Sequence, residues 1–458
     1  MVTGIWASHQ QSPPPEAIIV SGDLVQGVRV GEVDWQAAMN DQYRVANEFL
    51  NQITERLLGG DRSKVAIVPG NHDVCWNTSH ASMEPVPDNE YPHNLERLLQ
   101  DRDSGYRWSW RDRRLYRIRD RQLHGERLRF YWDFVEGFYK GFDLPRPIDR
   151  TLGYQLFEFF DRKVLVAGFD SIEGNDNFNY SGAIPRGAIA RCILGLRDNN
   201  RMYDLKIAVW HHSIHGPPNR NDYMEISEVH EMVGLGFQLG LHGHQHVAET
   251  GAHRVSVSQV QSMAVVSAGS LCAGSNELPR GVNRQYNLIV IDDDFRRGRV
   301  HVREMVEGGQ FTRKTNGPFM LGHVDLNWQP SVDAVGRPLR TDADNEWRSV
   351  LAAEDALKSG NPKEALRLLA GVDKGVGSHA RRIALEAMLA CCDWEAIETE
   401  FSDPKGTDEA VAAVVALTNN GKLEEATLIL RRERSHIEQS IYEDLEGRIS
   451  AKHWVRRR

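Results

Sequence analysis

Short apolar runs alternate with helical patterns along the first two thirds of the chain. Residues 17–21 form an apolar, β-branched run that predicts a buried strand, and residues 64–68 predict a second one. Between them, apolar residues recur at helical spacing over residues 35–58, and the pattern stops at Gly59-Gly60. Buried strands joined by a helix are typical of an α/β layer, in which each strand delivers polar side chains to a loop at its carboxyl end.

The alternation of strand and helix patterns is interrupted once and then resumes. Residues 75–150 crowd Arg, Trp and Tyr together, and we interpret them as an insertion that is partly helical at 121–139. Beyond it, the patterns predict strands at 153–160, 163–169, 205–210, 237–241, 263–267, 286–291 and 299–304, and helices at 185–196 and 227–233. The acidic run Asp292-Asp293-Asp294 falls between two of these strands, which indicates a hairpin turn.

The last part of the chain has a purely helical pattern. Residues 323–344 are dotted with Pro and Gly and predict a linker. Residues 345–458 then predict an all-α region with helices at 346–359, 362–370, 378–390, 394–401, 408–418, 423–432 and 437–454. The turns recur about every 30 residues, the spacing of stacked helical repeats, and the Ala-Leu and Glu-Ala pairs loosely resemble tetratricopeptide repeats.

Composition narrows the class of protein. With 458 residues and 41% hydrophobic content, we expect a globular chain of two or three domains. The net charge of −9 argues against a protein that coats nucleic acid but leaves local basic patches open. The five cysteines contain no Cys-x-x-Cys pair, which disfavours a disulfide framework. Without an apolar run long enough for a membrane span or a signal peptide, we expect a cytoplasmic protein with no membrane contact.

Polar motifs follow four of the predicted strands. They are Gly22-Asp23, Gly70-Asn71-His72-Asp73, His211-His212 and Gly243-His244-Gln245-His246. Alternate residues of an extended segment point the same way, so we expect His244 and His246 to reach into one pocket, an arrangement that suits a metal ion. Taken alone, a His-x-His pair is common in ordinary loops.

In this order, and each at a strand end, the four motifs resemble those of the calcineurin-like metallophosphoesterases. The resemblance covers roughly residues 16–304, so we expect residues 1–322 to form the phosphoesterase domain. It implies an α/β fold, a four-layer β-sandwich flanked by helices. It also implies two divalent metal ions, Mn, Fe or Zn, held about 3.5–4 Å apart.

The resemblance assigns a role to each motif residue. Asp23 would bridge both metals, His246 would belong to the first site, and the second site would be completed by Asn71, His211 and His244. A hydroxide between the metals would attack phosphorus in line. His72 would be the general acid, and Asp73 would orient it through a carboxylate–imidazole hydrogen bond. Of the two neighbouring histidines we prefer His211 as the ligand, with His212 and His215 lining the pocket or supporting the ligands.

One part of the family pattern is missing from this chain. The pattern begins with an apolar strand that ends in Asp-x-His, whereas His9 is the only histidine before Asp23 and has no aspartate before it. Three interpretations stay open: a natural protein that starts upstream, which we favour because loss of a central strand exposes its neighbours' edges; a one-metal enzyme with weakened hydrolysis; or an inactive binding scaffold. We expect poor metal binding at the first site and low activity.

The substrate and partners are less constrained. The Arg- and aromatic-rich insertion directly follows His72-Asp73, and guanidinium groups bind phosphates while Trp and Tyr stack on bases. We therefore favour a nucleotide or nucleic-acid phosphoester, although the aromatics would equally serve as the insertion's own core. The helical repeats indicate a protein partner. The alternative function is a catalytically impaired scaffold that acts as an interaction or sensor module.

Overall fold

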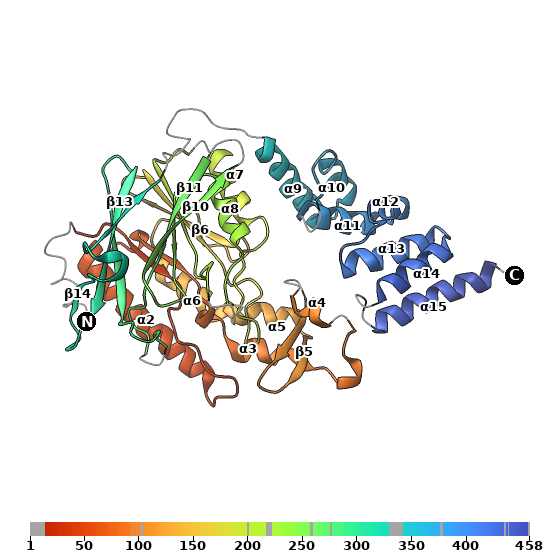
Figure 1. Cartoon of the computed structure of the whole chain (residues 1–458), viewed down its shortest axis with the longest axis horizontal. Coiled ribbons are helices and arrows are strands. Elements are labelled where there is room, and N and C mark those ends of the chain that lie inside the picture. The colour runs from red at the N-terminus through yellow and green to blue at the C-terminus, as the bar shows by residue number, and fades with distance from the viewer. Residues whose placement is uncertain are drawn as a thin grey trace. The chain divides into compact units, whose positions relative to one another are not determined.

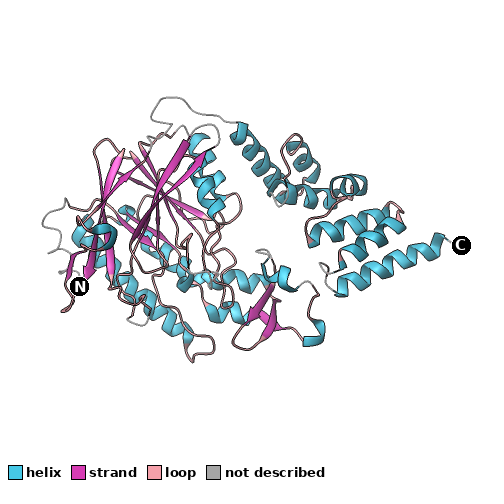
Figure 2. Cartoon of the chain, viewed as in Figure 1, coloured by secondary structure: helices cyan, strands magenta, loops and turns pink. Residues whose placement is uncertain are grey.

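Figures 1 and 2 show the helices and strands of the computed structural model. It describes residues 14–93, 95–100, 104–198, 201–216, 222–256, 260–274, 277–328, 342–375, 379–434, 437 and 439–456. The chain forms two compact units, one made of Met1–Met83 with Arg119–Leu339 and the other of Glu84–Ile118 with Arg340–Arg458. His9 and most of the expected linker 323–344 lie outside the described residues.

The largest sheet of the first unit has six strands in the order β10-β11-β9-β8-β7-β6. Their bounds are β6 Tyr154–Phe159, β7 Val164–Phe169, β8 Leu205–Val209, β9 Leu239–His242, β10 Glu249–Ser256 and β11 Val260–Ser267. The four inner strands are parallel and the two edge strands are antiparallel to their neighbours. The apolar runs predicted as strands in this part of the chain are confirmed.

A second group of strands packs against the first. β1 (Ile18–Ser21) and β2 (Val65–Val68) pair in parallel and are joined by helix α2 (Trp35–Leu58). A four-stranded antiparallel sheet contains β12 (Gln285–Ile291), β13 (Arg297–Met305), β14 (Phe311–Arg313) and β15 (Val324–Asn327). One hydrophobic core contains residues of all three sheets: Val65 of β2, Val164 of β7 and Val300 of β13. The fold is therefore the predicted α/β layered sandwich.

Two details of this layer can be compared with the sequence predictions: one agrees and one differs. The acidic run 292–294 does lie in the β12–β13 hairpin, as predicted. Residues 324–327, expected to be linker, instead form a strand that pairs with β13. The alternation Val-Asp-Leu-Asn is short, but it places Leu326 in the core while its neighbours remain outside.

Buried hydroxyl groups close one edge of β2. Tyr139 donates to the Val65 carbonyl at 2.6 Å and Tyr131 to the Ile67 carbonyl at 3.4 Å. Both tyrosines belong to α6 (Arg129–Tyr139), and carbonyls two residues apart lie on the same edge of a strand. Since satisfied edge groups cannot pair with another chain, α6 protects the strand that carries the Asn71 motif.

The remaining helices of the first unit flank the sheets or cover loops. They are α3 (Trp76–Ala81), α5 (Arg121–Gly125), α7 (Ala188–Asp198), α8 (Ile226–Gly234) and the short 3₁₀ turns at Arg62–Lys64, Asn71–Asp73, Glu126–Leu128 and Gly317–Phe319. The helical stretch predicted at 121–139 is thus confirmed as α5 and α6 with a 3₁₀ turn between them. No described helix has the length and apolarity needed to cross a bilayer.

The Arg- and aromatic-rich run forms strands. β3 (Met83–Pro85), β4 (Tyr106–Ser109) and β5 (Arg114–Ile118) make a three-stranded sheet, and a 3₁₀ turn at Asp88–Glu90 and α4 (Leu95–Gln100) lie between β3 and β4. Trp108 packs edge-on against Tyr91, with ring centroids 6.2 Å apart, and Leu115 is buried. Trp110, at the turn, is 84% exposed. The aromatics therefore serve partly as a local core, as one of the two sequence interpretations expected.

The rest of the second unit is a series of antiparallel helices. They are α9 (Asp342–Lys358), α10 (Pro362–Leu368), α11 (His379–Cys391), α12 (Trp394–Glu400), α13 (Thr407–Asn419), α14 (Leu423–Arg432) and α15 (Gln439–Arg456). Each helix packs on the next, and α9, α11, α13 and α15 also pack on one another in sequence. The predicted turns at Gly360, Cys392 and Gly421 all have positive φ. An all-α region of helical pairs is confirmed, and their likeness to tetratricopeptide repeats stays a prediction.

Candidate active site

Four strand ends of the first unit meet at one place. β1 leads into Gly22-Asp23, β2 into Gly70-Asn71, β8 into His211, and β9 into Gly243-His244. Two glycines allow this approach: a Cβ on Gly22 would lie 2.3 Å from His211 Nδ1, and one on Gly70 would lie 2.2 Å from Asp23 Oδ1. Any other residue at these positions would force the strand ends apart.

The side chains predicted for the second metal site are in mutual contact. Asn71 Oδ1 lies 2.9 Å from His211 Nε2 and 3.0 Å from His244 Nδ1. The two imidazole nitrogens are 3.3 Å apart, and His211 Nε2 is 3.3 Å from Asp23 Oδ2. The structure thus brings together Asp23, Asn71, His211 and His244 from four separate strands.

Each imidazole is fixed by its outer nitrogen. His211 Nδ1 donates to the Ser21 carbonyl at 2.8 Å, and His244 Nε2 lies 3.3 Å from Asp222 Oδ2. With a proton kept on the outer nitrogen, the inner nitrogen, which in His211 faces Asn71 and Asp23, would be able to give its lone pair to a metal ion once it released its own proton. Metal-ligating histidines in proteins are oriented in this way by a carbonyl or carboxylate. Asp222 had no sequence signal, since no local pattern marks it.

Charge at the cluster is dominated by Asp23. Burial raises the pKa of its carboxyl group, but the charge of His211 and its hydrogen bond outweigh burial and hold the pKa far below the usual range. Burial lowers the pKa of His211, and Asp23 more than offsets this, so the pKa is raised. Burial lowers the pKa of His244, with Asp222 opposing it in part. An ionised carboxylate in a buried cluster favours a cation beside it.

His72 and Asp73 do not form the expected pair. His72 Nδ1 donates to the Gln26 carbonyl at 2.8 Å. The Asp73 carboxylate accepts from the Gly70 amide at 2.8 Å, the Leu24 amide at 3.4 Å and the Tyr43 hydroxyl at 2.9 Å, and Asp73 is fully buried. In the 3₁₀ turn over Asn71–Asp73, successive side chains point about 120° apart, which sends these two in different directions.

His246 is separate from the cluster around Asn71. Its Nδ1 lies 3.0 Å from the Glu277 carbonyl. His244 and His246 have φ of 72° and 58°, so the turn is not extended and the two rings take different partners. The expectation that both imidazoles reach into one pocket depended on an extended backbone, and the left-handed turn removes that condition.

Ser171 is a site residue that sequence reasoning left without a role. Its hydroxyl lies 3.0 Å from His212 Nδ1 and accepts from the backbone amides of His211 and His212 at 3.0 and 3.2 Å. His212 is fully buried, and burial holds its pKa well below the usual value. The structure therefore turns His212 toward Ser171, which follows β7, and His211 toward Asn71.

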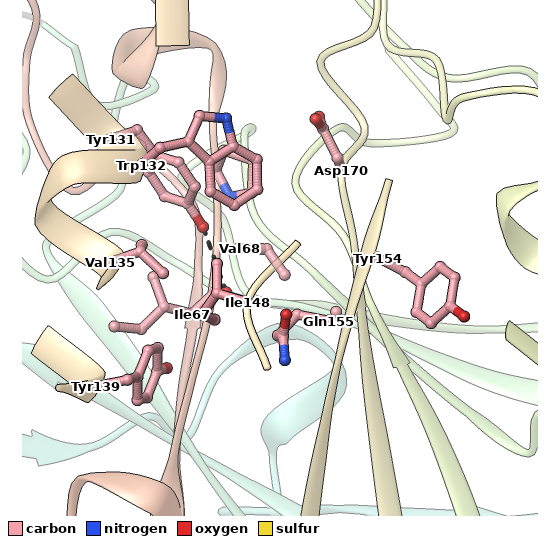
Figure 3. Close-up of a pocket in the computed structure, with 12 residues that line it drawn as sticks. Ile67, Val68, Tyr131, Trp132, Val135, Tyr139, Ile148, Tyr154, Gln155 and Asp170 are labelled. Carbon is pink, nitrogen blue, oxygen red and sulfur yellow. Dashed lines mark hydrogen bonds between the residues drawn. The ribbon is translucent and has the colours of Figure 1, made fainter. Parts of the chain in front are cut away.

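A small cavity lies between α6 and β6 (Figure 3). Pro69 is among the residues that line it. Its volume of about 20 Å³ has room for one water molecule. Burial raises the pKa of Asp170, one of its lining residues, to about 7. Because the cavity is so small and its tyrosines Tyr131 and Tyr139 already bond β2, it does not compete with the Asn71 cluster as a substrate site.

Comparison with known proteins identifies the family of the chain. The family model of the calcineurin-like phosphoesterases matches residues 4–248, more than half of the chain. The chain belongs to this family. Comparison with curated proteins returns no match. Among solved structures, a 5′-nucleotidase from Candida albicans SC5314 is similar to 82% of this chain at 11% identity and a TM-score of 0.23; the chain covers 57% of its length.

Calcineurin-like phosphoesterases typically use divalent metal ions. Among the described residues, no group of three or more His, Cys, Asp or Glu side chains is placed to hold a metal ion. Asp23, His211 and His244 therefore do not form such a group by themselves, and the cluster is joined by the contacts of the Asn71 amide oxygen with both histidines. Family membership supports a metallophosphoesterase and leaves the substrate and the metal identity to be established.

Proposed function

We propose that this chain is a metal-dependent hydrolase of a phosphomonoester or phosphodiester, with nucleotides or nucleic acids as the favoured substrates. The observation that carries the proposal is the contact of the Asn71 amide oxygen with both His211 Nε2 and His244 Nδ1, at 2.9 and 3.0 Å. Three polar side chains from three strands converge on one point, beside an ionised carboxylate.

The spacing of these atoms fits a divalent ion. For metal–ligand bonds of about 2.1 Å, neighbouring ligand atoms lie about 3.0 Å apart in six-coordinate and about 3.4 Å apart in four-coordinate geometry. The contacts among Asp23, Asn71, His211 and His244 measure 2.9–3.3 Å. One carboxylate, one amide and two neutral imidazoles form a donor set of the kind that binds Mn, Fe or Zn.

The metal ion and His72 would have different roles in hydrolysis. A divalent ion in this set supplies positive charge for the phosphoryl oxygens and lowers the pKa of water. His72 gives a proton to the leaving oxygen from Nε2, because Nδ1 is fixed on the Gln26 carbonyl. Its backbone amide donates to Asp23 Oδ1 at 3.0 Å, which ties the proton donor to the carboxylate.

Asp73 acts through position and not through proton transfer. Its carboxylate joins the amides that follow both β1 and β2 through the bonds to Leu24 and Gly70. This fixes the distance between the two loops that carry Asp23 and His72. Burial and the nearby charge of Asp23 raise its pKa to about 6.

The first metal site has fewer protein ligands than the second. Of the residues assigned to it, Asp23 lies in the cluster, while the ring of His246 faces the Glu277 carbonyl. Two protein ligands seldom hold a divalent ion tightly. We therefore expect this chain to bind one metal ion firmly, with weak or absent binding of a second.

The test is hydrolysis of bis-p-nitrophenyl phosphate with added Mn²⁺, together with elemental analysis of the purified chain. We expect metal-dependent turnover that falls about 10²–10⁴-fold in His72→Ala with its metal retained, and loss of the metal in Asn71→Ala. His230→Ala, an exposed histidine on α8, is the matched control and should change neither. Turnover that is equal in wild type and His72→Ala would contradict the assignment.

The alternative is an impaired phosphoesterase fold that serves as an interaction module. The position of His246 and the helical pairs of the second unit favour it. It predicts a chain that binds Mn²⁺ without turnover of any phosphoester and that captures a protein through the helical region. The same assay separates the two functions.

A further inference from the structure

A row of aromatic side chains begins at His72. The rings of His72 and Trp76 have centroids 6.1 Å apart, and those of Trp76 and Tyr180 are 6.0 Å apart. Trp76 is half-buried in the first turn of α3, and Tyr180 is 41% exposed. The row therefore extends from the proposed proton donor toward solvent.

The loop that carries Tyr180 is held rigidly. Asp176 Oδ1 accepts from the amides of Phe178 and Asn179 at 2.8 and 2.9 Å, and Asp176 is 1% exposed. The buried hydroxyl of Ser79, on α3, donates to Asn177 Oδ1 at 3.0 Å. A loop fixed by this many buried polar groups presents its exposed residues in one conformation, which lowers the entropy lost on binding.

The hydroxyl group and the ring of Tyr180 each have a neighbour within the protein. Its hydroxyl donates to the Asn177 carbonyl at 3.0 Å, so the polar atom is used and the ring face remains available. Its ring plane makes an angle of 62° with that of Trp76, and 41% of the residue is exposed to solvent. An exposed aromatic face whose hydroxyl is already bonded suits stacking better than hydrogen bonding.

The same loop also borders the metal-binding cluster. Gly182 lies against His212: a Cβ on Gly182 would be 2.5 Å from the His212 Cβ. The His212 ring is in turn 4.9 Å from that of His244. The loop thus runs from the histidines of the cluster to Trp76, whose ring lies beside that of His72.

We propose that the exposed ring of Tyr180, supported by its contact with Trp76, forms an aromatic platform for the planar ring of the substrate's leaving group, such as the nucleobase of a nucleotide. The proposal rests on the proposed function for its orientation, because His72 protonates the leaving oxygen and so places that group on the Trp76 side. Stacking requires only a flat π face, so any nucleobase or an aryl ester fits the same surface.

Binding measurements isolate the ring's contribution. The probes are the non-hydrolysable methylenephosphonate analogues of adenosine 5′-monophosphate and of ribose 5-phosphate, which differ only in the base. Each analogue is titrated calorimetrically into the full chain in the presence of Mn²⁺. The adenosine analogue should bind about tenfold more tightly than the ribose analogue. Trp76→Leu and Tyr180→Leu should reduce this ratio toward one without weakening the ribose analogue.

Two further variants guard against a merely structural effect. Tyr180→Phe keeps the ring and removes only the hydroxyl, so it should retain most of the preference even if Tyr180→Leu disturbs the loop. Trp110→Leu is the matched control: this tryptophan is 84% exposed and its ring contacts Trp108, which is not part of the row that begins at His72, so the ratio should stay at the wild-type value.

Failure of the platform differs from failure of the proposed function. Equal affinity of wild type for the two analogues, no measurable binding of either, or a ratio unchanged by both leucine variants would overturn the platform. Mn²⁺-dependent hydrolysis of a ring-free ester such as glycerol phosphate would then still support the proposed function. A preference for the adenosine analogue in a chain without turnover would support the platform and count against hydrolysis.

Discussion

The close approach of β1 to His211 makes Gly22 a sensitive position. Gly22 has φ of +96°, and a Cβ there would lie 2.3 Å from His211 Nδ1 and 2.9 Å from the Gly70 Cα. In Gly22→Ala, a left-handed backbone costs about 1–2 kcal/mol in a non-glycine residue. Relieving the overlap with a packed ring and a backbone atom adds about 1–3 kcal/mol. We therefore expect a loss of about 2–5 kcal/mol in the free energy of unfolding.

The chain offers a control that separates strain from contact. Gly31 has a similar φ of +83°, and nothing lies within 4 Å of the place where its Cβ would be. Gly31→Ala should lose only the backbone share, about 1–2 kcal/mol, and should bind Mn²⁺ like wild type. The measurements are urea unfolding followed by circular dichroism and calorimetric titration with Mn²⁺. The reasoning fails if Gly22→Ala matches Gly31→Ala in both stability and Mn²⁺ affinity.

Three further substitutions test the surroundings of the site. Tyr43→Phe removes the 2.9 Å bond to Asp73 and should destabilise the chain by about 1.5–3 kcal/mol in urea unfolding, while the pH profile of turnover stays unchanged. Ser171→Ala removes the acceptor that holds the backbone amide of the proposed ligand His211 and should weaken Mn²⁺ binding about 10–100-fold by calorimetry. Burial raises the pKa of Glu231 to about 7, above its value in the unfolded chain, so its ionisation opposes folding as pH rises. Glu231→Gln should therefore be more stable than wild type by about 1–3 kcal/mol at pH 8. In thermal unfolding this gain should shrink toward zero by pH 4.

The layered fold was predictable because burial leaves a strong mark on sequence. All four residues of β2 are buried, and an uninterrupted apolar run such as Val-Ala-Ile-Val is typical of a strand covered on both faces. The 24-residue helix α2 buries Met39, Leu50 and Ile53 at helical spacing and ends at Gly59, as its pattern indicates. Apolar residues at helical spacing likewise predict the helices of the second unit.

The direction of side chains was less predictable. His72 and Asp73 are adjacent in sequence, yet a tight 3₁₀ turn gives them different partners. His244 and His246 diverge because both have positive φ, which no alternation rule anticipates. Ser171 acts across a gap of 40 residues on the amide of His211. Contacts of this kind depend on tertiary packing, which leaves no local pattern.

The last residue of β1 and the segment that follows it set the orientation of two histidines with different tasks. The Ser21 carbonyl fixes the outer nitrogen of His211, and the Gln26 carbonyl fixes that of His72. β1 pairs only with β2 among the described residues, so its position depends on that one strand and on side-chain packing. A shift of β1 would therefore turn the proposed metal ligand and the proposed proton donor together. This coupling is why we expect Gly22→Ala to reduce Mn²⁺ affinity and turnover in the same variant, and why a substitution that moved only one of them would show that the two histidines are positioned independently.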